Sequence, residues 1–135
     1  MNRALSLPIA LTFLGAVSSL VADPRPLTVE EARELAHAAL PSLALRLPGL
    51  YLDSFSVPFY AEFYFFEIQW NSTGDISPIV DHYAVDSKSG DVWNAVVCRE
   101  LKTSELKKRQ ALLRKKIGLT HAQYGKIRRL GPECE

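Results

Sequence analysis

The chain has 135 residues, with 16 Lys and Arg, 15 Asp and Glu, and a formal net charge of +1. This length suits one domain with a single core. No segment carries a catalytic signature, a metal-ligand spacing or a glycine-rich phosphate-binding loop. We therefore expect a protein that is not an enzyme and that uses neither a metal nor another cofactor.

The first 22 residues have the features of a secretory signal peptide. Arg3 precedes an apolar run from Ala4 to about Val17, and small residues follow. The run is shorter than the ~20 residues of a membrane span. We expect cleavage after Ala22, with Ser18 and Ser19 as alternative sites, a single mature domain over residues 23–135, and a secreted or periplasmic location. Retention of the segment as a membrane anchor is the alternative.

Charge is distributed unevenly along the mature chain. Residues 23–98 hold four basic and eleven acidic side chains, whereas residues 99–135 hold eleven basic and four acidic ones. Such a split indicates either a basic arm for anionic polymers or a basic helical segment that docks on an acidic body. We favour docking, because the basic residues fall on amphipathic helices that need an apolar surface to cover.

The stretch LTVEEARELAHAALPSL predicts the first helix. Thr28 and Glu31 form a capping-box pattern at its start, and Pro41 disfavours helical geometry at the residue before it. Apolar side chains recur at the spacing of one buried helical face: Val29, Ala32, Leu35, Ala36, Ala39 and Leu43. His37 falls on the opposite face, which predicts a solvated side chain rather than a ligand.

Four strands are predicted from the aromatic and β-branched runs that follow. They cover residues 50–57, 61–70, 76–86 and 92–98. In the second strand, alternation places Phe63 and Phe65 on the face opposite Phe66, so this strand is expected to be covered on both sides. Gly90 supplies the positive φ needed by the short hairpin between the last two strands. That hairpin is expected to be scaffold.

The third strand is predicted to lie at an edge of the sheet. Pro78 carries no N–H and so cannot donate to a central ladder. An edge strand presents free main-chain groups that can extend a partner's sheet. The candidate partner-binding residues on this edge are Val80, His82 and Tyr83.

Two short basic helices are predicted after the sheet. Thr103 or Ser104 caps the first helix and Thr120 caps the second. The first helix carries an apolar stripe made of Leu106, Leu113 and Ile117. We expect this stripe to pack on the sheet face that carries Phe63 and Phe65, because those rings need cover.

Both cysteines, Cys98 and Cys134, lie in the mature chain. An even pair in an exported protein is most simply a disulfide, and two free thiols are the alternative. A metal site is not expected, because His37, His82 and His121 are scattered and show no ligand spacing with the cysteines.

The segments LTVEEARELAHAAL and HYAVDSKSGDV resemble the opening helix and terminal hairpin of PepSY domains, which occur in propeptides of secreted metallopeptidases and in small envelope proteins. The resemblance covers about residues 27–97. It implies an α+β fold with an N-terminal helix packed on a four-stranded antiparallel sheet, here followed by two short C-terminal helices over 99–135. It also implies a peptidase as a candidate partner. The same order of elements fits a cystatin-like fold.

We therefore expect an exported, non-catalytic protein-binding module, with peptidase inhibition as one form of that role. The alternative is an envelope-surface protein that contacts anionic polymers or lipids peripherally through its basic helices. The candidate anion-binding residues are Lys107, Lys108, Arg109, Arg114, Lys115 and Lys116.

Two further functions are less well supported by the sequence. A small hydrolase comes third, because Asp81 and His82 are adjacent on a strand and so point to opposite faces. Nucleic acid is not an expected partner, because export removes access to it and no aromatic residue interleaves the basic run.

Overall fold

The computed structural model describes residues 22–41, 44, 48–71, 79–128 and 131–132, and for residues 54–60 it describes the backbone alone. The expected signal peptide lies almost wholly outside these ranges, so its cleavage stays a prediction. Among the helices in the described ranges, none has the length and apolarity that crossing a bilayer requires.

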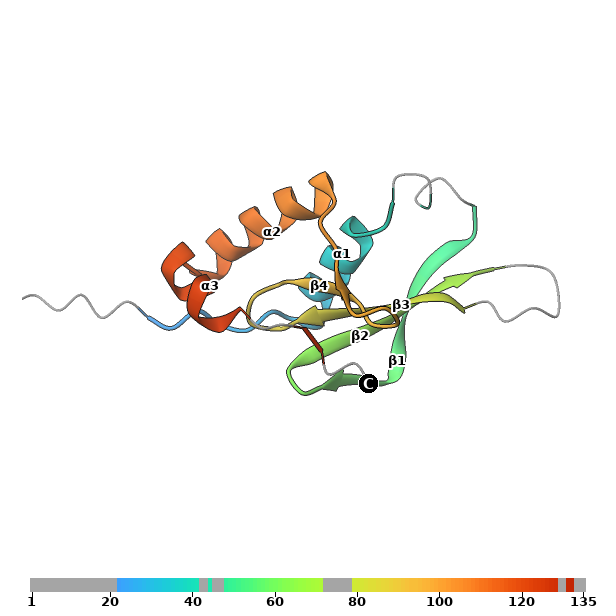
Figure 1. Cartoon of the computed structure of the whole chain (residues 1–135), viewed down its shortest axis with the longest axis horizontal. Helices are drawn as coiled ribbons and strands as arrows, with labels where there is room; N and C mark the ends of the chain where they lie inside the picture. The colour runs from blue at the N-terminus through green and yellow to red at the C-terminus, as the bar shows by residue number, and fades with distance from the viewer. Residues whose placement is uncertain (1–21, 42–43, 45–47, 72–78, 129–130, 133–135) are drawn as a thin grey trace, which may run out of the picture.

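Three helices and five strands make up the described chain. In order they are α1 (Val29–Ala38), β1 (Leu50–Tyr60), β2 (Phe63–Trp70), β3 (Ile79–Asp86), β4 (Val92–Asn94), β5 (Arg99–Glu100), α2 (Ser104–Ile117) and α3 (His121–Ile127). The strands form one antiparallel sheet in the order β1-β2-β3-β4-β5. Helices α1 and α2 lie on the same face of this sheet (Figure 1). The expected α+β class is confirmed, with five strands instead of four.

The helix starts follow the predicted capping residues. The Thr28 hydroxyl accepts from the main-chain N–H of Glu31, and the Glu31 carboxylate accepts from that of Thr28. Thr103, rather than Ser104, caps α2. Thr120 opens α3 with a second capping box. These side chains satisfy donors that the first helical turn leaves unpaired.

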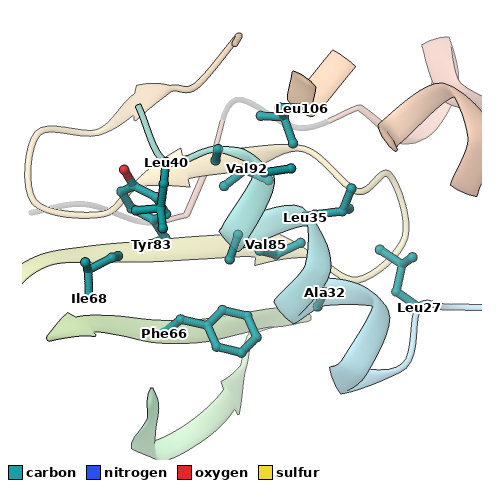
Figure 2. Packing of buried hydrophobic residues seen from close by; sticks show 13 residues of the cluster. Leu27, Ala32, Leu35, Leu40, Phe66, Ile68, Tyr83, Val85, Val92 and Leu106 are labelled. Atoms are coloured by element: carbon teal, nitrogen blue, oxygen red, sulfur yellow. The ribbon is translucent and has the colours of Figure 1, made fainter. Parts of the chain in front are cut away.

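The main core fills the space between the two helices and the sheet, as Figure 2 shows. Phe66 and Val85 contribute from the central strands, Leu35 contributes from α1, and Leu106 contributes from α2. All four side chains are at most 1% exposed. The period-two alternation predicted for β2 is confirmed, because Phe63 lies in a separate cluster on the other face, with Phe65 packed against it.

The prediction that α2 covers Phe63 and Phe65 is wrong. Leu106 lies in the cluster around Phe66, and Leu113 packs against that cluster. The chain enters α2 on the α1 side, where the Thr103 hydroxyl donates to the carbonyl of Ala38 at 2.9 Å. The apolar stripe of α2 therefore completes the core that α1 begins.

A later part of the tail reaches the far face of the sheet. Phe63, Ala84 and Trp93 form the apolar cluster there. The backbone of Gly131 lies directly on the indole of Trp93, since a Cβ at this glycine would come within 2.9 Å of the ring. The rings of the far face are thus covered in part by chain beyond α3.

The edge position predicted for the third strand is also wrong. β3 pairs with β2 along most of its length and with β4 at Tyr83–Val85. Tyr83 is buried in the core, and the carbonyl of His82 accepts from the N–H of Ala95. β3 runs from Ile79 to Asp86, and Pro78, on which the edge prediction rested, lies outside the described residues.

The last predicted strand is interrupted after three residues. The side-chain oxygen of Asn94 accepts from the N–H groups of Val96 and Val97, and its amide donates to both carboxylate oxygens of Asp81 at 2.9 and 2.8 Å. Cys98 then adopts a φ of +49°. This asparagine-centred turn separates β4 from β5, which the apolar alternation over residues 92–98 did not reveal.

Candidate functional site

The turn between β3 and β4 anchors the basic helices. Buried Asp91 accepts from the Arg114 guanidinium at 2.8 Å and from the Tyr124 hydroxyl at 2.9 Å. The same guanidinium lies 4.0 Å from the centre of the Tyr124 ring. Burial, followed by the nearby Asp91 charge, raises the pKa of Tyr124. The expected docking of the basic tail on the acidic body is confirmed, and the β3–β4 turn supplies its anchor.

The six candidate anion-binding residues do not form one free cluster. Arg114 is committed to Asp91, Lys116 pairs with Glu31 at 2.9 Å, and Arg109 pairs with Glu105 at 3.0 Å. Lys107, Lys108 and Lys115 are exposed and make no ion pair in the described part of the chain. Half of the predicted basic surface is therefore engaged within the protein.

Glu31 joins three segments that are distant in sequence. Its carboxylate accepts from both terminal nitrogens of Arg25, at 2.7 and 2.8 Å, and from Lys116 at 2.9 Å. The N–H of Thr28 is a further donor. The bond with Arg25 is the largest cause that holds the pKa of Glu31 well below its usual range, against the opposing effect of burial. The lead segment, α1 and α2 thus share one carboxylate.

We expect this carboxylate to make stability depend on acid pH. A lowered folded-state pKa contributes stability that is complete above the unfolded value of about 4.3 and is lost as pH falls through the folded value. Glu31→Gln should lower the free energy of unfolding by about 1–2 kcal/mol at pH 7, since solvent screens the half-exposed Arg25 and Lys116. Urea melts should show this difference shrinking below about pH 4.3. A difference that stays constant down to pH 2 would contradict the assignment.

A groove of about 930 Å³ lies between the polar face of α1, the edge strand β1 and the first turns of α2. Its lining residues are Glu30, Arg33, Glu34, His37, Ala38, Leu50, Tyr51, Leu52, Glu105 and Arg109. A smaller groove of about 140 Å³ shares Glu34 and Arg109 with it and continues between the two helices. Both grooves are lined by α1 and α2, and the larger one also reaches the edge strand β1.

The charges in the larger groove are not balanced. Arg109 is paired with Glu105. Arg33 donates to the carbonyl of Leu52 at 2.9 Å, and its guanidinium lies 5.3 Å from the centre of the Phe66 ring. Glu30 and Glu34 are exposed and have no ion-pair partner in the described chain. Glu30, Glu34 and Glu105 outnumber the two arginines, so the groove has a net negative charge and presents two carboxylates that form no ion pair among the described residues.

The main chain of β1 adds polar groups to the same place. Within the described residues β1 pairs only with β2, so it forms one edge of the sheet. The N–H of Asn71 donates to the carbonyl of Gly49, which makes this pair a hydrogen-bonded one. Because such pairs alternate along an antiparallel ladder, the N–H and C=O groups of Leu50 and Leu52 point away from β2. These groups face the open side of the strand.

Sequence reasoning missed this groove. The polar residues of α1 recur at helical spacing, a pattern that an ordinary solvated helix face shows as well. His37, expected to be solvated, is exposed as predicted and lines the groove. β1, one of the two edge strands of the described sheet, carries no proline in its first half to mark it. Among the described residues no cluster of three or more potential metal ligands occurs.

The structure describes one of the two cysteines. Cys98 has no free thiol in the described structure. Cys134, its expected partner, lies outside the described residues, so the pairing stays a prediction.

We expect a disulfide between Cys98 and Cys134 to stabilise the fold by about 3–4 kcal/mol, the chain-entropy value for a loop of about 35 residues. The double variant Cys98→Ser with Cys134→Ser should melt at correspondingly lower denaturant. Mass measurement after alkylation without reduction checks the bond directly. Two alkylated thiols per molecule would rule it out.

Comparisons with known proteins show the fold alone. No known family matches the chain, and no curated protein matches it. A chain in the structure of a type VI secretion system effector-immunity complex from Pseudomonas protegens has the same fold, with a TM-score of 0.59 and 23% sequence identity. The match covers 75% of this chain and 85% of that chain.

Proposed function

We propose that the protein is an exported, non-catalytic module that binds another protein. The observation that carries this proposal is the groove between α1 and the edge of β1, where outward main-chain groups of Leu50 and Leu52 lie beside carboxylates that form no ion pair among the described residues. Such an edge is a common place for another chain to add to a sheet. Features of a signal peptide at the start of the sequence support a secreted or periplasmic location.

Two observations suggest the class of partner. The structural neighbour comes from an effector-immunity complex, which supports a partner that is itself a protein, such as an effector. The PepSY-like segments support an exported peptidase. Both point to recognition of a whole protein, and neither requires catalysis by this chain.

The test begins with the mature protein, residues 23–135, immobilised and exposed to the exported fraction of its source organism. A captured protein is then purified and recombined with the mature chain, and the stoichiometry is measured by light scattering and calorimetry. We expect a defined complex that persists at moderate salt, together with inhibition if the partner is a peptidase. Failure to reconstitute a stoichiometric complex with any captured protein would contradict the proposal.

The anionic-surface alternative depends on Lys107, Lys108 and Lys115, which remain exposed on α2. Electrostatic binding to vesicles containing anionic lipid would weaken steeply with added salt. A triple Lys→Gln variant at these positions separates the two functions. If this variant loses vesicle binding and the parent forms no protein complex, the alternative replaces the proposal.

A further inference from the structure

We propose, on the premise that the protein binds a protein partner, that the partner contributes an extended segment with a lysine or arginine. The segment lies along β1 at Leu50–Asp53 and places its basic side chain between Glu30 and Glu34. This inference specifies the surface that binds and the chemistry of what it binds.

The main-chain groups of β1 determine the extended shape of the occupant. The outward N–H and C=O groups of Leu50 and the outward N–H of Leu52 have the spacing that a neighbouring strand matches. The outward carbonyl of Leu52 is held by Arg33 in the free protein. A carbonyl oxygen has two lone pairs, so this one can also accept from the N–H of an arriving strand while Arg33 stays bound. Arg33 also protects the edge against unselective strand addition, as charged side chains do on other edge strands.

The charges on α1 determine which charge a side chain of the bound segment should carry. Glu30 and Glu34 are four residues apart on one helical face, and both line the groove. The two arginines of the groove already have partners, in Glu105 and in the Leu52 carbonyl. A segment with a basic side chain would pair with the two carboxylates, whereas an acidic one would be repelled.

Side chains of a strand point alternately to its two faces, and the site differs on these two sides of the added segment. Side chains on one face of the added segment would point to α1 and meet the carboxylates above an apolar floor that includes Ala38. Side chains on the other face would lie next to Tyr51, which is 45% exposed and donates from its hydroxyl to Gln69 at 2.6 Å. In a segment whose basic and β-branched residues alternate, the basic side chains would point to the carboxylates of α1 and the β-branched ones would lie next to Tyr51.

Three fluorescent heptapeptides provide the probe. One has the sequence TKVKVKT, the second is TEVEVET, and the third repeats the lysine sequence with N-methylated central amides. Binding to the mature protein is followed by anisotropy at low and moderate salt. We expect the lysine peptide to bind, and the acidic and N-methylated peptides to bind at least about tenfold more weakly, a difference of about 1.4 kcal/mol.

Variants of the protein test the two carboxylates. Glu30→Gln combined with Glu34→Gln should weaken binding of the lysine peptide about five- to tenfold. The control Glu62→Gln changes a carboxylate outside the groove, which is half-exposed and paired with Lys88, and it should leave binding unchanged. Thermal melts check that both variants are folded.

Equal binding of the lysine and acidic peptides, undiminished binding of the N-methylated peptide, or no binding of the lysine peptide would each overturn the inference. So would full retention of peptide binding by the double variant. A result that overturns this binding site can be told apart from one that overturns the proposed function. A reconstituted partner complex that tolerates both glutamine substitutions would place the binding surface elsewhere and leave the function standing.

Discussion

Replacing Asp91 with alanine will lower the free energy of unfolding by about 3–5 kcal/mol, the range for removing one member of a buried ion pair. The carboxylate is 3% exposed, whereas its partner Arg114 is 22% exposed. Its loss leaves the Arg114 guanidinium without its carboxylate partner and removes the acceptor for the Tyr124 hydroxyl. Because these groups connect both C-terminal helices to the β3–β4 turn, the effect exceeds that of one surface contact.

Urea unfolding followed by circular dichroism measures this effect. The control Glu105→Ala breaks the exposed pair with Arg109, which should cost at most about 0.5 kcal/mol. Asp91→Asn keeps the shape of the side chain and should fall between the two. A loss below about 1 kcal/mol for Asp91→Ala would show that the network does not hold the helices in place.

Phe66→Ala should destabilise the fold by a comparable amount, about 3–5 kcal/mol. The ring is 0% exposed and lies in the core between α1 and the sheet. Its removal leaves a cavity in a core made of elements from both ends of the chain, and it also removes the ring beside the Arg33 guanidinium.

The shift of the denaturant midpoint gives the change in the free energy of unfolding, provided that the m-value is the same for this variant and the parent. Leu112→Ala is the matched control, because that side chain is 66% exposed on α2 and its truncation should change stability by less than about 0.5 kcal/mol. Similar losses for the two variants would contradict the described core.

The local features of this fold could be read from the sequence. Thr28, Thr103 and Thr120 each mark a helix start, and Gly90 occupies the positive-φ position of the hairpin with a φ of +71°. These signals act within a few residues, so local chemistry determines them. The alternation of Phe63 and Phe66 is equally local, and it correctly separated the two faces of β2.

The order of the strands and the placement of α2 could not be read in this way. Pro78 suggested an edge, but β3 pairs with both β2 and β4 and is the central strand of the described sheet. The apolar stripe of α2 fits either face of the sheet by pattern alone. The choice depends on long-range contacts, such as Gln110 donating to the carbonyl of Gly90 at 2.8 Å.

The candidate site was beyond sequence reasoning for the same reason. Its residues come from α1, from the start of β1 and from the start of α2, and Glu30 and Arg109 are 79 positions apart in the chain. The two carboxylates Glu30 and Glu34 look like an ordinary solvated helical face until β1 is placed beside them. Only the folded arrangement shows that Arg33 and Arg109 are already engaged.

Residue-resolved amide exchange in the reconstituted partner complex tests the binding surface most directly. In the free protein the outward amides of Leu50 and Leu52 should exchange quickly, while those of Tyr51 and Asp53, directed at β2, exchange slowly. The account predicts that partner binding slows the two outward amides selectively. Unchanged exchange at Leu50 and Leu52, with protection confined to the exposed lysine face of α2, would contradict it.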